Sequence, residues 1–150
     1  MEKPTVSIRL MRSGDFKAVV AIDEKVLKVP RPDYYELKFD KLFKSRDYLP
    51  TSLVAEAEDG RVVGFVMGEL YMGEYGIFQE TATLDTIGVD PRYRHLGIGK
   101  RLIEEFVDHL ESLGVRKIHT LVDLNQSELI HFFSANQFRP SNTINLERNI

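Results

Sequence analysis

The sequence predicts one α/β domain built around a single β-sheet. Its 150 residues are 43% hydrophobic, so the chain is long enough for one well-buried core and too short for two ordinary domains. Segments with strand and helix patterns follow in the order strand, two helices, three strands, helix, strand, helix and final strands. The sequence contains no repeat and no low-complexity linker. We therefore expect residues 1–150 to form a single domain.

The N-terminal third predicts a strand followed by two helices. Val6–Met11 has the alternation of a half-buried strand. Ser13 suits an N-cap, and a helix is expected over Phe16–Leu27 until the proline-containing run 29–32 ends it. A second helix is expected over Asp33–Arg46.

A β-hairpin is expected next. Ser52–Glu58 and Val62–Tyr71 are apolar runs joined by Asp59-Gly60, and Asp-Gly between two such runs is a strong turn signal. Gly64 and Gly68 within the second run indicate a bulge or a close approach of another part of the chain.

The centre of the chain predicts a strand, a short glycine-containing loop and a long amphipathic helix. Ala82–Val89 is rich in β-branched residues and closes at Asp90-Pro91, because proline removes a ladder donor and forces a turn. Apolar residues then recur at helical spacing from Leu102 to Leu113, and Gly114 supplies a C-terminal stop.

The loop before this helix has the composition of a phosphate site. Gly97 and Gly99 let a ligand approach the backbone, and the first turn of a helix offers N–H groups without intrahelical partners. The chain carries a net charge of −3, but this loop and its flanks are positive, with Arg92, Arg94, Lys100 and Arg101. A dinucleotide fingerprint needs a third glycine where Leu102 stands, and a Walker-type loop needs another spacing, so both are excluded.

The C-terminal part predicts a strand over Lys117–Val122, a short helix over Gln126–Asn136 and a last strand or hairpin from Phe138 through Thr143–Leu146. The run Asn125-Gln126-Ser127-Glu128 has the pattern of a capping box at the start of the helix.

Composition excludes several kinds of site. The chain has no cysteine, so disulfides, zinc–thiolate sites and thiol catalysis are excluded, and its four histidines have no metal-ligand spacing. The 20 lysines and arginines against 23 aspartates and glutamates do not suggest nucleic-acid binding. No segment approaches the roughly 20 apolar residues of a membrane span. We expect a soluble, cytoplasmic protein that binds no metal, no nucleic acid and no membrane.

Four features follow one another: the strand Leu84–Val89, the Asp-Pro turn, the run Arg94-x-x-Gly97-x-Gly99 and the helix. Together they resemble the acetyl-CoA signature of the GCN5-related N-acetyltransferase (GNAT) family. The resemblance covers nearly the whole chain. It implies a mixed, mostly antiparallel sheet of about six to seven strands flanked by about four helices, whose fourth and fifth strands splay apart around the pantetheine arm. The cofactor-binding residues that it implies are Ile87, Gly88, Val89, Arg94, His95, Leu96, Gly97, Ile98, Gly99, Lys100 and Asn125.

The same resemblance implies an enzyme, an acetyl-CoA-dependent N-acetyltransferase that acts on a primary amine of a small molecule or protein by direct attack in a ternary complex. An alkylammonium must first lose a proton to a carboxylate or a water relay. Asp85, at alternation with Ile87 and Val89, is the first candidate base, and Glu80 is the second. For Asp85 the competing interpretation is a structural hydrogen bond or ion pair.

No general acid is assigned. Phe133 stands where many GNAT members carry a tyrosine that protonates the departing thiolate. Ser134, His131, Tyr71 and a bound water remain as candidates. This departure leaves a non-catalytic acyl-CoA-binding or regulatory module as the alternative to an enzyme.

The loop Met72–Phe78 is apolar and aromatic, and it predicts either a loop packed on the core or one wall of an acceptor site. In the second case Tyr71, Tyr75 and Phe78 would stack against an organic amine and exclude water. By the habit of the resembled family, an exposed C-terminal edge strand could pair two subunits in a homodimer.

Overall fold

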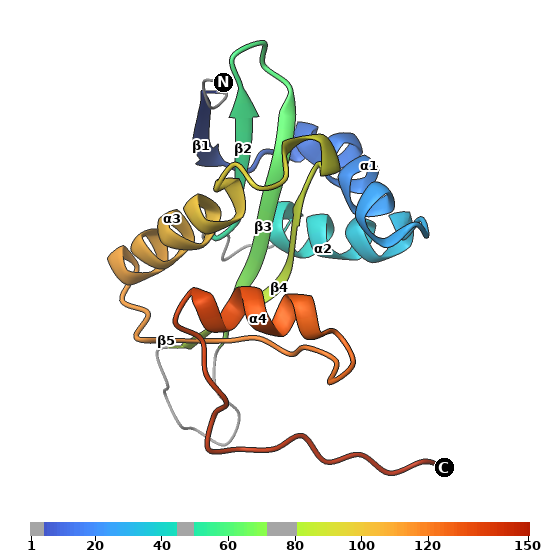
Figure 1. Cartoon of the computed structure of the whole chain (residues 1–150), viewed down its shortest axis with the longest axis vertical. Coiled ribbons are helices and arrows are strands. Elements are labelled where there is room, and N and C mark those ends of the chain that lie inside the picture. The colour runs from blue at the N-terminus through green and yellow to red at the C-terminus, as the bar shows by residue number, and fades with distance from the viewer. Residues whose placement is uncertain (1–4, 45–49, 72–80) are drawn as a thin grey trace. The chain divides into compact units, whose positions relative to one another are not determined.

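The computed structural model describes residues 5–44, 50–71 and 81–150, and for Tyr71 the backbone alone. The chain divides into two compact units, residues 1–120 and residues 121–150 (Figure 1). Among the described residues, no helix is long and apolar enough to cross a membrane. Each unit is described by itself below.

A five-stranded mixed sheet forms the centre of the first unit, with its strands in chain order. The first three strand pairs are antiparallel and the last is parallel. The strands are β1 (Val6–Leu10), β2 (Leu53–Ala57), β3 (Val62–Tyr71), β4 (Thr81–Val89) and β5 (Lys117–His119). The expectation of about six to seven strands is therefore too high for the described residues. The expected extent of β3 is confirmed, whereas β5 is shorter than the predicted Lys117–Val122.

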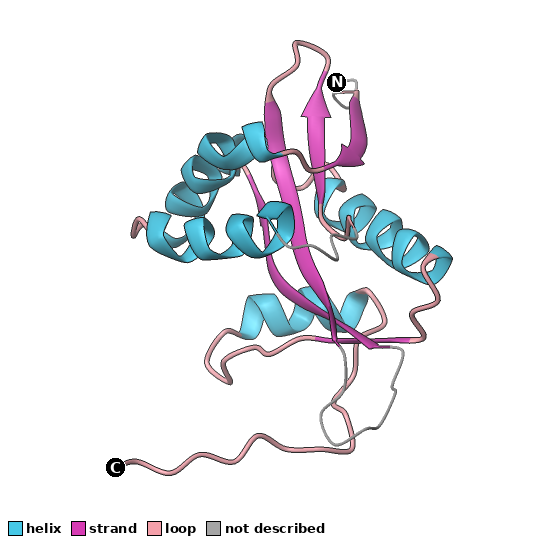
Figure 2. Ribbon diagram, turned by 180° about the vertical axis from the view of Figure 1, so that it is seen from behind, coloured by secondary structure: helices cyan, strands magenta, loops and turns pink. Residues whose placement is uncertain are grey.

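Three helices cover the two faces of this sheet (Figures 1 and 2). Helices α1 (Phe16–Leu27) and α2 (Pro32–Lys44) lie on one face, and α3 (Ile98–Ser112) lies on the other. The expected bounds of α1 are confirmed. The predicted N-cap at Ser13 is wrong, because Ser13–Asp15 forms a 3₁₀ turn and α1 begins only after Asp15.

The face below α1 and α2 holds a mostly apolar core. Tyr35 of α2 and Phe65 of β3 are fully buried, and their rings meet edge to face with centroids 5.9 Å apart. The other members of this core are Met11, Val19, Ile22, Phe39, Leu42, Val54 and Met67. The alternation of β3 directs Phe65 and Met67 to this face. Because helices cover both faces of β3, its sequence is a nearly continuous apolar run.

Helix α3 packs its apolar stripe on the opposite face. The buried residues of the stripe are Ile98, Leu102, Ile103, Phe106 and Leu110. Gly114 follows the helix at a φ of 90°, in the left-handed region, which confirms the expected stop.

Gly68 of β3 lies against both α3 and β4. A Cβ atom at Gly68 would stand 2.3 Å from the carbonyl oxygen of Thr83 and 2.5 Å from the ring of Phe106. The ladder between β3 and β4 also shifts register here, because Met67 pairs with Thr86 but Gly68 pairs with Leu84. Of the two alternatives expected from the glycines, the close approach is present at Gly68, and the bulge beside it has its extra residue, Asp85, in β4.

In the second unit, helix α4 (Ser127–Ala135) carries an aromatic cluster. The ring of Phe133 lies 5.5 Å from that of Phe132 and 5.1 Å from that of Phe138, centroid to centroid. The predicted capping box is wrong, because Gln126 is the N-cap and makes no side-chain capping bond.

The predicted last strand, from Phe138 through Thr143–Leu146, is also wrong. Residues 137–150 contain no strand, and Ile144 and Leu146 are exposed. A hydrophobic alternation predicts which side chains share a face, but a strand also needs a neighbouring strand to pair with.

We expect Gly68→Ala to destabilise the protein by about 2–3 kcal/mol, because the added methyl group meets a backbone carbonyl that cannot move without disturbing the ladder. The measurement is urea unfolding followed by far-UV circular dichroism. Gly14→Ala is the matched control, because no heavy atom lies within 4 Å of a Cβ at Gly14. Equal unfolding midpoints for the two variants would contradict the close approach.

Candidate active site

Strands β4 and β5 are neighbours over a short distance only. Thr81–Thr83 pair with Lys117–His119, and then the Thr120 hydroxyl donates to the carbonyl of Leu84 at 2.9 Å. Beyond Leu84, β4 continues to Val89 without a paired β5 residue. Because β5 ends at His119, it leaves the second half of this edge of β4 without a β5 partner.

The backbone of β4 turns two donors toward this unpaired edge. The N–H of Asp90 donates to the carbonyl of Val63 at 2.8 Å, so Asp90 faces β3, and by alternation so does Gly88. The N–H groups of Ile87 and Val89 then point away from β3. Of the three β4 residues expected to bind a cofactor, Ile87 and Val89 thus present backbone donors here and Gly88 does not.

Asp90 anchors the turn that follows β4. Its side chain is buried, accepts a hydrogen bond from the Arg92 N–H at 3.0 Å and pairs with Lys25 Nζ of α1 at 3.1 Å. Burial disfavours the charged carboxylate, but the Arg92 N–H and the Lys25 ammonium outweigh it and hold the pKa of Asp90 below its ordinary value. The turn is thereby fixed to α1.

The loop after this turn ends at the N-terminus of α3. His95 and Gly97 have φ angles of 63° and 80°, and the first hydrogen bond into the helix runs from Arg101 N–H to the Gly97 carbonyl at 3.0 Å. Helical N–H groups ahead of that bond have no intrahelical acceptor, and they lie at the positive end of the helix dipole. Left-handed residues between extended or helical ones are typical of anion-binding loops.

Some, but not all, of the charged side chains of this loop are free to bind a ligand. Arg94, His95 and Lys100 are exposed, as a ligand-binding role requires. Arg101 donates instead to the carbonyl of Val6 at 2.8 Å, so its guanidinium ties α3 to β1. The loop therefore offers backbone donors and at least two exposed cationic side chains, those of Arg94 and Lys100.

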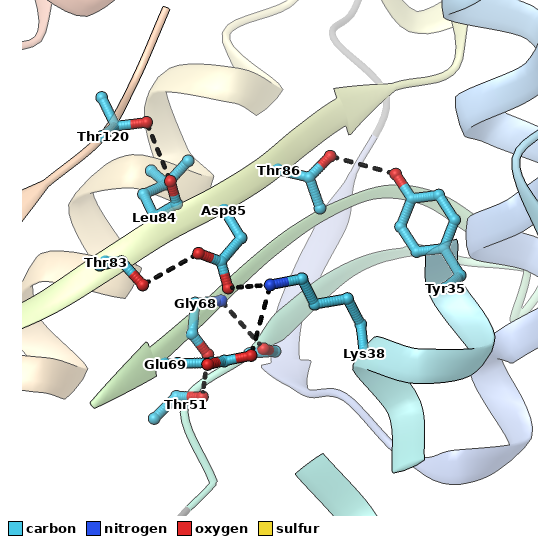
Figure 3. Close-up of polar contacts among 11 residues, drawn as sticks. Tyr35, Lys38, Thr51, Gly68, Glu69, Thr83, Leu84, Asp85, Thr86 and Thr120 are labelled. Atoms are coloured by element: carbon cyan, nitrogen blue, oxygen red, sulfur yellow. Dashed lines mark hydrogen bonds and ion pairs between the residues drawn. The ribbon is translucent and has the colours of Figure 1, made fainter. Parts of the chain in front are cut away.

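A second polar cluster lies on the α2 face of β4 (Figure 3). Asp85 accepts hydrogen bonds from Lys38 Nζ at 3.0 Å and from the Thr83 hydroxyl at 2.9 Å. Lys38 Nζ also lies 3.3 Å from Glu69 Oε1 of β3. Sequence reasoning missed Lys38 and Glu69, because nothing in their local sequence indicates that they meet Asp85.

The bulge explains why Asp85 faces α2. Thr86 pairs with Met67, and its hydroxyl lies 3.1 Å from the Tyr35 hydroxyl of α2, so Thr86 points to the α2 face. Asp85 is the extra residue of the bulge and points to the same face, while Ile87 points to the α3 face. The expected alternation of Asp85 with Ile87 and Val89 is therefore wrong.

Helix α2 is fixed beside this cluster by a buried network. The Tyr35 hydroxyl donates to Asp23 at 2.6 Å, and Arg31 binds both oxygens of Asp23 at 2.8 and 2.9 Å. Burial, followed by the hydrogen bond to Asp23, raises the pKa of Tyr35 well above its ordinary value, so the hydroxyl stays protonated.

Comparison with known proteins decides the family. The family model described as the acetyltransferase (GNAT) family matches residues 17–138. The chain belongs to the GNAT acetyltransferase family. This confirms the family predicted from the β4–α3 motif.

Relatives of this GNAT chain are acetyltransferases by name. It is 30% identical to the L-2,4-diaminobutyric acid acetyltransferase of Nocardia farcinica, over 87% of this chain and 63% of that protein. It is 29% identical to an acetyltransferase of Pectobacterium atrosepticum, over 97% of this chain and 96% of that protein. The chain therefore spans less than two thirds of the Nocardia protein and nearly all of the second relative.

Solved structures show the same fold. An aminoglycoside N-acetyltransferase, AAC(6')-Iy, in complex with CoA has a TM-score of 0.78 at 18% identity, covering 99% of this chain and 97% of that one. The ribosomal-protein-S18-alanine N-acetyltransferase from Escherichia coli has a TM-score of 0.74 at 21% identity, covering 92% and 80%. The predicted fold class is confirmed.

Several expected site residues of this GNAT chain lie outside the described residues or in the second unit. Glu80, Tyr75 and Phe78 lie outside the described residues, as does the side chain of Tyr71. Asn125, His131 and Ser134 belong to the second unit. Among the described residues, no group of three or more His, Cys, Asp or Glu side chains could hold a metal ion.

We expect Asp90→Asn to cost about 1–2 kcal/mol of stability at neutral pH, because it removes the charge that binds Lys25. The folded-state pKa of Asp90 is lowered, so its contribution is full above the unfolded value of 3.8 and is lost as pH falls through the folded value. The stability gap between wild type and variant should therefore shrink as pH falls. Urea unfolding from about pH 7 to about pH 2 measures it.

Asp108→Asn, an exposed position on α3, is the control and should follow the wild-type curve. A gap for Asp90→Asn that stays constant through the acid range would refute the lowered pKa.

Proposed function

We propose that this chain is an acetyl-CoA-dependent N-acetyltransferase that acetylates a primary amine by direct attack in a ternary complex. The observation that carries the proposal is the half-unpaired edge of β4, which leads within a few residues to the free N–H groups at the start of α3. One ligand with an extended amide arm and a diphosphate would fit both features.

Coenzyme A is that kind of ligand. Its diphosphate would bind at the start of α3, where backbone N–H groups, the helix dipole and the cations of Arg94 and Lys100 favour an anion. The loop residues proposed for this contact are Arg94, His95, Leu96, Gly97, Ile98, Gly99 and Lys100. The pantetheine amides would pair with Ile87 and Val89 as a short strand does, and Asn125 is a further proposed contact.

The acetyl group would then lie at the unpaired part of β4. A backbone N–H of Ile87 or Val89 would donate to the thioester oxygen, on which negative charge develops during attack. Such a donor is already fixed by the ladder with β3, so it needs no reorganisation during the reaction.

The acceptor amine would approach from the α2 face. Asp85 lies there on the same strand, and its carboxylate would take the proton that the ammonium must lose before attack. Glu80 remains the second candidate base. Tyr71, Tyr75 and Phe78 remain the proposed aromatic contacts of the acceptor.

The departing thiolate does not require a dedicated acid. A thiol has a pKa of about 8.5 against about 10 for an alkylamine, so the thiolate is much the better leaving group and water can protonate it. This removes the chemical objection raised by Phe133, whose ring packs between those of Phe132 and Phe138.

The names of the relatives support an amine acceptor but differ in its size. They include a diamino acid, aminoglycosides and an alanine of a ribosomal protein. The second candidate function, a non-catalytic acyl-CoA-binding module, is favoured only by the absence of a tyrosine at Phe133.

We expect the wild-type protein to release thiol from acetyl-CoA in the presence of an amine panel. The panel consists of butylamine, 2,4-diaminobutyric acid, sisomicin and a peptide with an N-terminal alanine. Gly99→Leu should weaken acetyl-CoA binding, measured by calorimetry, at least about tenfold, because the side chain fills the space that the diphosphate needs.

Glu105→Leu is the control, since it adds the same side chain at an exposed position of the same helix. Acetyl-CoA binding without thiol release by any panel member would favour the non-catalytic module. If a folded Gly99→Leu variant binds acetyl-CoA with unchanged affinity, the loop is not part of the cofactor site.

We expect Asp85→Asn to lower kcat about 100-fold and to remove the acid limb of the pH–rate profile that depends on its carboxylate. Acetyl-CoA affinity should stay within about twofold, because Asp85 lies on the α2 face and not at the loop. If Asp85→Asn keeps the wild-type pH–rate profile but has reduced thermal stability, the role of Asp85 is structural.

A further inference from the structure

The ammonium of Lys38 bridges two carboxylates from different strands (Figure 3). Lys38 Nζ lies 3.0 Å from Asp85 Oδ2 of β4 and 3.3 Å from Glu69 Oε1 of β3. The side chains of Lys38, Asp85 and Glu69 are only 19%, 16% and 32% exposed. An ion pair on the open surface is screened by water, but this one is mostly shielded and its geometry is correspondingly fixed.

Both oxygens of Asp85 are held. Oδ2 faces Lys38, and Oδ1 accepts the hydroxyl hydrogen of Thr83 at 2.9 Å. Together with the bulge, which sets the direction of the Cα–Cβ bond, these two contacts restrain the orientation of the carboxylate. Each oxygen keeps a second lone pair that can accept a hydrogen bond from another group.

We propose that Lys38 is a positioning residue for acetyl transfer: its ammonium holds the Asp85 carboxylate at the β4 bulge, in the orientation in which Asp85 accepts the proton of the acceptor amine. This inference rests on the proposed function. Glu69 is the second anchor of Lys38, because it holds the ammonium from the neighbouring strand.

Lys38 suits this role because it stays charged. Burial disfavours its ammonium, but the hydrogen bond and charge of Asp85, with further contributions from Tyr34 and Glu69, outweigh burial and raise the pKa of Lys38. A lysine that remains protonated at neutral pH cannot serve as a base or nucleophile. It can fix and partly neutralise a carboxylate.

Other charged or titratable groups face this cluster from each neighbouring element. Tyr34 of α2 has its ring centroid 5.5 Å from Lys38 Nζ, and the Asp23–Arg31 pair lies next to Tyr34 and Tyr35. His119 of β5 pairs with Thr83 in the parallel ladder and so belongs to the same face. Of these groups, His119 carries an imidazole on the face of the proposed base, so the test must separate its contribution to the pH profile.

Removing the Lys38 charge has two consequences. Asp85 and Glu69 then lose the cation that both of them bind, and neighbouring like charges repel each other. Asp85 also loses its main tether, and displacement of a catalytic group by about 1 Å can cost about 100-fold in rate.

The test compares Lys38→Met, Lys38→Arg and Thr83→Val with the wild type. Thiol release from acetyl-CoA gives kcat and KM with each member of the amine panel across the pH range, and calorimetry gives the affinity for acetyl-CoA. Lys41→Met is the matched control, because Lys41 is exposed on the same helix and the substitution removes the same charge. Each profile is repeated in a His119→Asn background.

Lys38→Met should lower kcat at least about tenfold and move the acid limb up by about one pH unit, with acetyl-CoA affinity within about twofold of wild type. Lys38→Arg should restore the position of the limb, since it keeps the charge. Thr83→Val should lower kcat less and move the limb less than Lys38→Met does, since it removes a hydrogen bond but no charge. Lys41→Met should match the wild type, and His119→Asn should not abolish the shift.

The inference is overturned if Lys38→Met keeps the wild-type kcat and limb, if Lys38→Arg shifts the limb as far as Lys38→Met does, or if Lys41→Met has the same effect. A wild-type protein that releases no thiol with any panel member would instead overturn the proposed function, and the inference with it. Should Lys38→Met fail to fold, the Lys38→Arg and Thr83→Val profiles decide.

Discussion

The contact of Gly68 with Phe106 and with the backbone of β4 is the constraint on which the rest of the structure depends. No side chain fits between these groups, so β3 can approach both α3 and β4 only with a glycine at this point. On the β2 side, the Thr51 hydroxyl donates to the Gly68 carbonyl and the Ser52 hydroxyl accepts from the Gly68 N–H. Beside Gly68 the β3–β4 ladder shifts register by a bulge at Asp85. The bulge turns Asp85 to the α2 face, so the packing of α3 at Gly68 lies next to the polar cluster under α2.

Paired charges fix the helices of the first unit to its sheet and loops. Asp23 binds Arg31, Asp90 binds Lys25, and Asp85 binds Lys38, and in each case the carboxylate is buried or mostly shielded. An isolated charge in such a place would be costly, so each carboxylate requires its partner. These ion pairs fix the orientation of neighbouring elements more than they add stability. Each pair joins two elements, which apolar packing alone would allow to shift relative to each other.

The two halves of the proposed reaction use different properties of β4. Its backbone offers N–H donors in the plane of the sheet, at the edge that β5 leaves unpaired, and these suit an amide arm and a developing oxyanion. Its side chains at the bulge offer a carboxylate perpendicular to that plane, on the α2 face. A thioester along the edge and an amine from the α2 face would therefore meet without sharing binding groups.

The sequence by itself determined the elements whose signals are local. Local start, stop and turn signals predicted the bounds of α1 and β3, glycine marked the end of α3, and the β4–loop–α3 motif predicted the family. Only the tertiary structure decided that Asp85 turns to α2, that Lys38 and Glu69 meet it, and that residues 138–146 form no strand. The reason is physical: backbone preference and side-chain alternation act over a few residues, whereas a bulge, a strand partner or the 47-residue separation between Lys38 and Asp85 depends on how distant segments pair.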